Sequence, residues 1–380
     1  MSLHIDLTEF LGNPITTGIQ RVLGEICRHA PAGWVVPVRL ERDGYRELPI
    51  ALMDAIKRLF IRGSGAAAEE IRQLGRPENG KPITLSGDDN VLVPEVFDTP
   101  YRVAFFNRMR EDELRRVRFI VYDLLPLTRP EYFIAASAVD AYGYFRMLTR
   151  ATDCGFISEE TRDDYFQRLK RTDATSGVVL PLGSDSLGPR TPPVRNRPLK
   201  FVVVGTIEPR KNHRLILDAF RPLLGKVPGL QLTFLGRIGW VEPDLAAEIT
   251  SLATDANSSF EHIPAPSDGL VREHISSARA TIYVSTAEGY GLPPVESLWL
   301  GTPVIASRAI PSLKRLPRKG IEYTQELDPD CLREIVQRFR DDNFANRKIE
   351  ETAQLDLPTW RSFANEVLRW CGVSKGSDPQ

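Results

Sequence analysis

The chain contains little cysteine, and its cysteines show no pairing pattern. Four cysteines occur in 380 residues, far apart and without a C-x-x-C pair. Such usage is typical of free thiols in a reducing compartment rather than of a disulfide framework. The first ten residues show no basic segment followed by an apolar core, so we expect no signal peptide and a cytoplasmic protein.

Long apolar runs and an excess of charge of one sign are also missing. No stretch approaches the roughly 20 apolar residues that cross a bilayer, and the formal net charge is −1. Overall charge therefore attracts neither nucleic acid nor an anionic membrane. The tryptophans form no stacking array with basic residues, and we expect no nucleic-acid partner.

Several catalytic signatures are absent. The chain has no G-x-G-x-x-G fingerprint, no P-loop and no G-x-S-x-G elbow. Its histidines lack metal-ligand spacing, so we expect no metal and no cofactor. Asp328-Pro329-Asp330 spells D-x-D, which can hold a metal-bound diphosphate. We interpret it as a turn whose Asp330 caps the following helix.

The order of elements predicts two α/β domains. A length of 380 residues favours two cores, and strands alternate with helices on both sides of the proline-rich segment 184–198. We expect an N-terminal domain over 1–187, a second domain over 188–356, and a helix in 357–380 that returns to the first. Both domains would be doubly wound and face a cleft. Residues 50–87 show no steady period and give no prediction.

Residues 285–307 carry the most informative pattern. They read as a loop with Glu288, Gly289, Tyr290 and Gly291, then a helix from residue 295 with Glu296 in its first turn. Apolar strands flank this unit. A helix N-terminus attracts phosphate, whereas carboxylates beside it suit hydroxyls, and the two together describe a nucleotide-sugar. An ordinary buried βα unit remains the alternative at this point.

Other loops add candidate residues. Arg210 and Lys211 follow the strand 201–204, which ends at Gly205-Thr206, and their charges suit a diphosphate; a solvated charged loop is the alternative. Asp123 follows another buried strand, at the edge where α/β sheets bind ligands. Gly18 opens a helix after a glycine-bearing loop, as an ordinary βα turn also would.

These motifs together resemble the retaining GT-B glycosyltransferases of family 4, the glycosyl transferases group 1. Residues 288–296 with 301–305 are similar to the family's E-x7-E element, and residues 205–212 are similar to its donor-phosphate loop. Residues 17–21, 123–126 with 130–133, 157–158 with 161–163, and 181–185 also fit. The resemblance keeps the order of the motifs over most of the chain.

The resemblance implies a role for each candidate. Arg210 and Lys211 would bind the donor diphosphate in place of a metal, Glu288 would hold sugar hydroxyls and Glu296 the ribose. Gly18 would let the first domain approach the phosphates on closure. The remaining candidates implied at the site are catalytic Asp123 and donor-binding Thr206, Gly289, Tyr290, Gly291 and Leu292.

The implied reaction moves a hexose from a nucleotide-sugar, GDP-mannose being favoured, to a glycan or lipid-linked acceptor of a surface polysaccharide. Tyr122 departs from the family, which often has histidine there, and residues 311–323 are basic where the family has a glycine-rich loop and an acid. A GT-B-like binding protein without turnover is the alternative, and a nucleotide-sugar epimerase is a third reading. A peripheral membrane contact through residues 308–319 or 108–118 is a further expectation.

Overall fold

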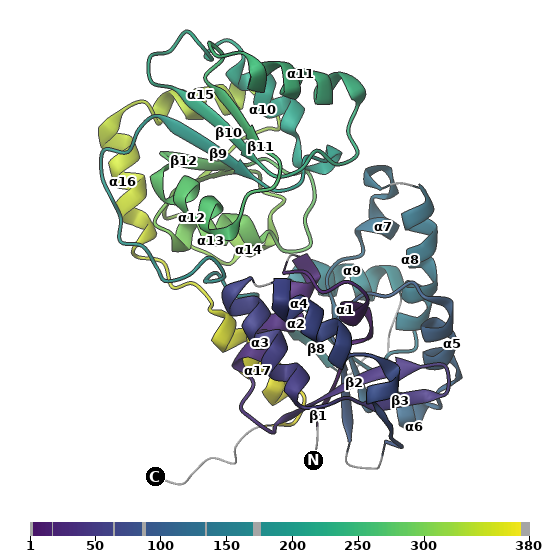
Figure 1. The fold of residues 1–380 in the computed structure, drawn as a ribbon. Coiled ribbons are helices and arrows are strands. Elements are labelled where there is room, and N and C mark those ends of the chain that lie inside the picture. Colours follow the sequence, from purple (N-terminus) through teal and green to yellow (C-terminus); the bar gives the residue numbers. More distant parts are fainter. Residues whose placement is uncertain are drawn as a thin grey trace. The chain divides into compact units, whose positions relative to one another are not determined.

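The computed structural model describes residues 3–16, 18–63, 65–85, 89–133, 135–169 and 176–373 of the chain. Two compact units divide it: Met1–Leu182 together with Pro358–Gln380 form unit 1, and Gly183–Leu357 form unit 2. Each unit is described by itself (Figure 1). No helix in these ranges is long and apolar enough to cross a membrane.

The described strands of unit 1 form one eight-stranded sheet in the order β4-β3-β2-β1-β5-β6-β7-β8. Neighbouring strands are parallel along the series β2-β1-β5-β6-β7-β8. At one edge, β3 pairs antiparallel with β2, and β4 pairs antiparallel with β3. The strands are β1 (Leu3–Asp6), β2 (Val35–Glu41), β3 (Gly44–Glu47), β4 (Lys81–Pro82), β5 (Asn90–Val93), β6 (Val117–Val121), β7 (Asp153–Phe156) and β8 (Ser176–Val179).

Helices connect these strands, and the last helix of the chain belongs to the same unit. Trp370 donates its indole N–H to Asp153 Oδ1 (2.8 Å), and Asn90 donates to the Cys371 carbonyl (3.3 Å). The helices are α1 (Thr8–Gly12), α2 (Gly18–His29), α3 (Ala51–Arg62), α4 (Gly65–Leu74), α5 (Pro100–Arg108), α6 (Glu111–Leu114), α7 (Leu125–Thr128), α8 (Ala135–Leu148), α9 (Glu159–Leu169) and α17 (Trp360–Trp370). Helix α17 packs against α2.

Unit 2 is a parallel sheet with helices on both faces. Its strand order, β11-β10-β9-β12-β13-β14, reverses direction between β9 and β12. The strands are β9 (Lys200–Val204), β10 (Gln231–Leu235), β11 (Phe260–Ile263), β12 (Ala280–Tyr283), β13 (Val304–Ala306) and β14 (Ile321–Tyr323). The helices are α10 (His213–Phe220), α11 (Pro243–Thr254), α12 (Asp268–Ser277), α13 (Leu292–Trp299), α14 (Pro311–Lys314), α15 (Pro329–Arg338) and α16 (Asp342–Thr352).

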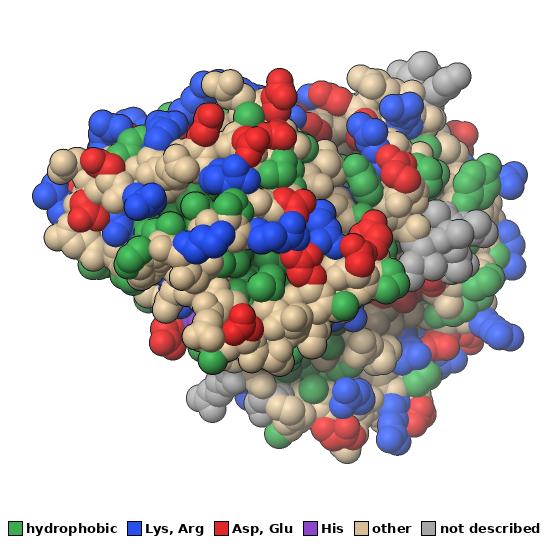
Figure 2. Space-filling view, turned by 90° about the horizontal axis from the view of Figure 1, so that it is seen from above, with side chains coloured by type: hydrophobic (Ala, Val, Ile, Leu, Met, Phe, Trp, Pro, Cys, Tyr) green, Lys and Arg blue, Asp and Glu red, His purple; other side chains and the backbone are tan. Residues whose placement is uncertain are grey.

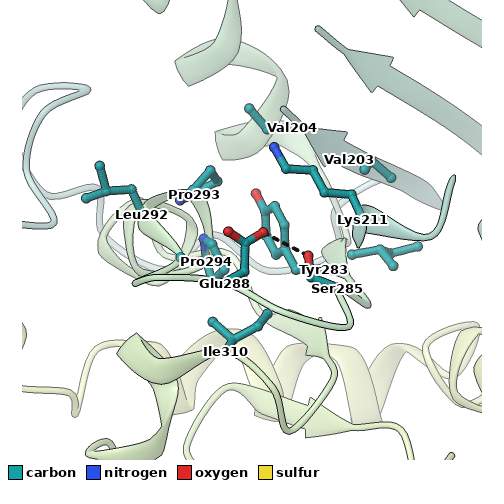
Figure 3. A pocket seen from close by; sticks show the side chains of 12 residues that line it. Val203, Val204, Lys211, Tyr283, Ser285, Glu288, Leu292, Pro293, Pro294 and Ile310 are labelled. Atoms are coloured by element: carbon teal, nitrogen blue, oxygen red, sulfur yellow. Dashed lines mark hydrogen bonds between the residues drawn. The ribbon is translucent and has the colours of Figure 1, made fainter. Parts of the chain in front are cut away.

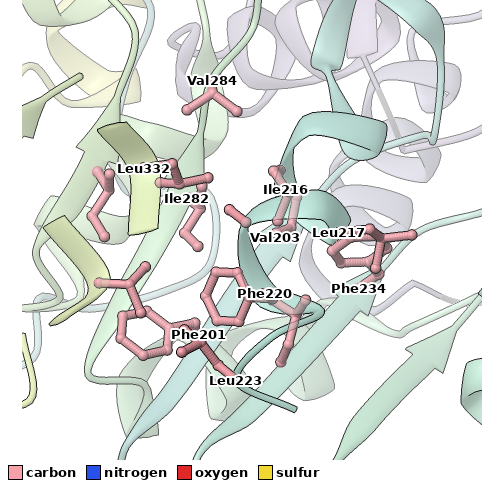
Figure 4. Packing of buried hydrophobic residues seen from close by; sticks show 14 of the residues in the cluster. Phe201, Val203, Ile216, Leu217, Phe220, Leu223, Phe234, Ile282, Val284 and Leu332 are labelled. Carbon is pink, nitrogen blue, oxygen red and sulfur yellow. The ribbon is translucent and has the colours of Figure 1, made fainter. Parts of the chain in front are cut away.

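Alternation along β9 explains why both faces are covered. Phe201 and Val203 pack with α10, α11 and α15 in one cluster (Figure 4), while Val202 packs with α12 in a second cluster. A strand buried on both faces reads as a continuous apolar run, because successive side chains point to opposite sides. The run 201–204 therefore predicts this strand correctly.

Two local predictions are wrong. Helix α13 begins at Leu292 rather than at residue 295, because prolines are tolerated in a first turn whose N–H groups have no partner. Glu296 consequently lies in the second turn. The cap of α15 is Asp328, not Asp330: its carboxylate accepts from the backbone N–H groups of Asp330 (2.8 Å) and Cys331 (3.2 Å).

The proline-rich segment expected to join the domains is packed against unit 2. Arg197 is buried and donates to the carbonyls of Ala278 (3.0 Å) and Gly301 (2.9 Å). Trp299 donates its indole N–H to the Gly188 carbonyl (2.9 Å). Ordered polar contacts of this kind fix the segment on the unit instead of leaving it as a free linker.

Candidate active site

The candidate active site lies in unit 2, at the carboxyl ends of β9 and β12. Ligands in doubly wound sheets bind where the strand order reverses, outside the carboxyl ends of the strands. A pocket occupies this point, and its walls come from both strands and the loops after them. Its lining includes Val203, Val204, Lys211, Ile282, Tyr283, Ser285, Glu288, Gly291, Leu292, Pro293, Pro294 and Ile310.

Arg210 joins the two loops by contacting an acid on each. Its guanidinium lies 2.5 Å from Glu208 Oε1 and 2.5 Å from Glu288 Oε2. Its backbone carbonyl accepts from the Thr286 N–H (2.7 Å), so main chain and side chain both bridge the loops. Glu288 also accepts from the Ser285 hydroxyl (2.9 Å), an interaction that Figure 3 shows at the pocket wall. These contacts preorganise the charges, which lowers the cost of binding an anion there.

Lys211 projects its ammonium into the same pocket (Figure 3). A Cβ on Gly205 would lie 2.4 Å from Lys211 Nζ, so a side chain at that position would displace the lysine. Gly205 also has a φ of +134°, which side-chain-bearing residues rarely adopt. Burial lowers the pKa of Lys211, and the nearby Glu288 and Glu208 carboxylates oppose that lowering.

The glycine loop before α13 brings backbone close to the pocket. Gly291 has a φ of +88°, and a Cβ there would lie 2.5 Å from the Ile310 side chain. Ser312 of α14 fixes the loop by donating its N–H to the Tyr290 carbonyl (2.9 Å) and its hydroxyl to the Gly291 carbonyl (2.7 Å). Because Pro293 and Pro294 have no N–H, the start of α13 can offer a ligand only the backbone N–H groups of the cap residue Gly291 and of Leu292.

Glu296 occupies a different position from Glu288. It is buried in the second turn of α13 and accepts a hydrogen bond from the Ser186 hydroxyl. The pocket lining includes Glu288 but not Glu296. The structure therefore brings Arg210, Lys211, Glu288, Gly291 and Leu292 together. Thr206 lies in the loop after β9, and Gly289 and Tyr290 lie in the loop after β12.

The candidates in unit 1 lie at the carboxyl ends of its own strands. Gly18 opens α2 with a φ of +55°, as a glycine at a left-handed position does; Thr17 lies outside the described residues. Asp123 follows β6 and accepts from the Leu125 N–H (3.0 Å). Tyr122 is buried, its hydroxyl donates to the Pro94 carbonyl (2.5 Å), and burial raises its pKa.

Glu208 is the residue that the sequence reading did not single out. It is buried at 5% exposure and lies between Arg210 and Lys211, whose Nζ is 3.8 Å away. An acid two and three positions before a cation pair is a weak signal, because charged loops are common. Within the described residues, no three His, Cys, Asp or Glu side chains gather in a group able to hold a metal ion.

Solved structures with the same architecture define the fold. Anabaena HepE in complex with UDP and glucose superposes with a TM-score of 0.62 at 14% identity, covering 98% of this chain and 100% of that chain. The two doubly wound units of this protein make up the GT-B fold. Identity at this level shows the fold alone.

Sequence comparison then identifies the family of unit 2. Residues 189–355 match the model of the glycosyl transferases group 1, and this part of the chain belongs to that family. The serotype-specific mannosyltransferase WbdA of Escherichia coli is 26% identical over an alignment of 310 residues that covers 76% of this chain and 38% of WbdA. The O-antigen chain mannosyltransferase B of Escherichia coli is 29% identical over 170 residues, 43% of each protein. The matched stretches thus span less than half the length of these relatives.

Proposed function

We propose that the protein is a retaining glycosyltransferase that moves a hexose from a nucleotide-sugar to a glycan or lipid-linked acceptor in surface polysaccharide biosynthesis. The observation that carries the proposal is the pairing of Arg210 with Glu288 beside Lys211 at the reversal of the unit 2 sheet. The family of residues 189–355 and the similarity to two mannosyltransferases support the reaction class and a mannose-like sugar. We place the reaction in the cytoplasm, with the acceptor reached at a membrane face.

The proposed chemistry assigns charge to three side chains. Arg210 and Lys211 bind the donor diphosphate and stabilise the negative charge that develops as it leaves, so no obligatory metal is needed. Glu288 releases Arg210 to the phosphate and accepts hydrogen bonds from sugar hydroxyls. Exchanging Glu288 for the donor phosphate costs little free energy, because both are anions that bind the same guanidinium.

The other candidates take supporting roles in the proposal. Glu296 holds the ribose hydroxyls, and the backbone N–H groups at Gly291 and Leu292 meet the phosphate or sugar. Asp123 and Gly18 contribute from unit 1 when the donor is bound. A GDP-mannose donor is favoured by the names of the sequence relatives, whereas the structure neighbour HepE holds UDP and glucose.

The test is release of nucleoside diphosphate from a panel that includes GDP-mannose and UDP-glucose, with and without acceptor extract. We expect release from one donor, loss of release in Glu288→Ala and Lys211→Ala, and no inhibition by a chelator. Arg214→Ala is the matched control, because Arg214 pairs with Asp244 and Glu248 on the same unit, away from the pocket lining.

The binding-protein alternative predicts a different result. Tyr122 uses its hydroxyl on the Pro94 carbonyl inside unit 1, so the histidine common in the family has no equivalent here. Tight nucleotide-sugar binding without release, under every acceptor condition, would establish that alternative. Product anomers from the active enzyme, resolved by NMR, would separate retention from inversion.

A further inference from the structure

A second cluster of cations lies in unit 2, outside the candidate active site. Arg308, Lys314, Leu316, Arg318 and Tyr323 line a surface pocket, which we name the basic pocket. The lining contains three cations and no acid. Acidic and basic side chains are interspersed over the face shown in Figure 2, so a pocket lined by one sign of charge is a local departure.

Tyr323 holds two of the cations. The guanidinium carbons of Arg308 and Arg318 lie 5.4 and 5.7 Å from the centre of its ring. The ring is half-buried, and its hydroxyl donates to the Leu313 carbonyl (3.3 Å), which fixes its orientation. An aromatic face attracts a guanidinium without neutralising it. Arg308 and Arg318 therefore keep their full positive charges although both lie at the same ring.

Neighbouring acids do not neutralise the two arginines of the basic pocket. Glu322, the residue before Tyr323, points to the other face of β14, as alternation along a strand requires. Its carboxylate is bound there by Lys348 (2.8 Å) and Arg338 (3.0 Å). Within the described part of the chain, Arg308 and Arg318 form no ion pair with any acid. An anion entering the basic pocket would relieve their repulsion.

The basic pocket lies on the same edge of the sheet as the candidate active site. Tyr283 of β12 pairs in register with Ala306 of β13, and Ala306 pairs with Tyr323 of β14. Strands in a sheet are about 4.8 Å apart, so Tyr283 and Tyr323 are separated by about 10 Å. Helix α14 spans the gap: Ile310 just before it lines the active-site pocket, and Lys314 at its end lines the basic pocket.

We propose that the basic pocket binds a phosphate group other than the donor diphosphate. Arginine forks match phosphate geometry, and two arginines held on one ring suit a phosphate anion. The description of this phosphate as a second one rests on the proposed function, which assigns the donor diphosphate to Arg210 and Lys211. A phosphate on a soluble acceptor and a phospholipid headgroup offer the same chemistry.

Calorimetric titration with inorganic phosphate at low ionic strength tests the proposal. The wild-type protein is expected to bind phosphate at two sites, and Arg308→Ala/Arg318→Ala at one, with affinity at the lost site reduced at least about tenfold. Arg210→Ala/Lys211→Ala should keep the site that the first variant loses. Lys226→Ala/Arg340→Ala, which removes two exposed cations of unit 2 outside both pocket linings, is the matched control and should bind as wild type does.

Vesicles distinguish the two sources of phosphate. Co-sedimentation uses phosphatidylcholine vesicles with and without phosphatidylglycerol. Loss of binding to the anionic vesicles in Arg308→Ala/Arg318→Ala assigns the phosphate to a lipid headgroup, whereas unchanged vesicle binding with lost phosphate binding assigns it to a soluble ligand. Phosphate titration of Arg308→Ala/Arg318→Ala identical to that of wild type would overturn the proposal. Phosphate titration needs no turnover, so the two proposals can fail separately. A protein that binds phosphate in the basic pocket but releases no nucleoside diphosphate would refute the proposed function and support the phosphate site.

Discussion

Two arginines, one in each unit, are held by two acids, yet they do different things. Arg102 in unit 1 is 1% exposed and contacts Asp6 (2.6 Å) and Glu9 (2.8 Å). Arg210 in unit 2 contacts Glu208 and Glu288 at 2.5 Å each, but its side chain is 18% exposed at a pocket. The number of acids is the same, so the difference lies in access to solvent.

The partners explain how that difference arises. Asp6 ends β1 and is wholly buried with its arginine, and it also accepts from the Tyr45 hydroxyl (3.1 Å). Glu288 lies on a glycine-bearing loop at the pocket, and in the proposed function its arginine exchanges it for the donor phosphate. A buried pair cannot exchange partners, because any replacement would leave an uncompensated charge in the interior. Arg102 therefore serves the fold, whereas Arg210 is the arginine that we propose binds a ligand.

Removing Arg102 should have the largest effect on stability. Arg102→Met leaves Asp6 buried without its charge partner, and we expect the free energy of unfolding to fall by about 3–5 kcal/mol. Urea unfolding followed by circular dichroism measures it. Arg110→Met is the control, since Arg110 is exposed with Asp112, and such a pair contributes little to stability. Equal losses in the two variants would show that burial does not distinguish these arginines.

Removing Arg210 should reduce activity strongly and affect stability less than removing Arg102 does. Arg210→Met is expected to reduce nucleoside diphosphate release about 10²–10³-fold, as loss of one preorganised charge-stabilising group does. Its free energy of unfolding should fall less than that of Arg102→Met, because Lys211 stays 3.8 Å from Glu208 and the site lies at a pocket. Initial rates and urea unfolding on the same preparations check both. A large loss of stability with intact kcat would place Arg210 in the same class as Arg102.

The arginine of unit 1 and the site of unit 2 also differ in how far the sequence predicts them. Arg210 and Lys211 follow an apolar run and a glycine, and that local pattern places them at the end of a buried parallel strand. Asp6 and Arg102 are 96 residues apart in the chain. No local pattern joins them, since only the folded sheet brings β1 and α5 together.

Helix boundaries show the same limit. Residues 50–87 gave no prediction, although Leu52, Ile56 and Leu59 of α3 have helical spacing and are buried. Glu208 and the start of α13 at Leu292 depend on contacts with neighbouring loops. Strands buried on both faces are predictable from composition, whereas polar partners and first turns are set by tertiary structure.

Glu95 is a buried acid of unit 1, and its raised pKa makes the stability of the protein depend on pH. Burial raises its pKa to about 8, with the Phe10 N–H opposing that shift and Asp6 and Glu9 adding to it. The unfolded chain ionises near the ordinary value of 4.5 while the folded protein keeps the proton. Folded protein then binds more protons between pH 4.5 and pH 8, so stability falls as the pH rises through this window.

Glu95→Gln removes that titration and should flatten the curve. We expect the wild type to lose about 2 kcal/mol more than the variant between pH 6 and pH 8, measured by urea unfolding across that range. Glu111→Gln, an exposed acid of α6, is the control and should follow the wild type. A Glu95→Gln curve parallel to that of wild type would mean that the acid is ionised in the folded protein.

The smallest expected effect concerns Asp328. It belongs to the D-x-D motif, which can hold a metal-bound diphosphate, but its carboxylate binds backbone N–H groups instead. Asp328→Ala removes the carboxylate that accepts from two N–H groups at the start of α15, and should lower the free energy of unfolding by about 1 kcal/mol. Asp330→Ala removes only an exposed contact with Arg333, and should change stability by about 0.5 kcal/mol or less. Thermal unfolding of both variants measures the difference. A loss of donor affinity in Asp328→Ala, with stability unchanged, would return this acid to the functional class that contains Glu288.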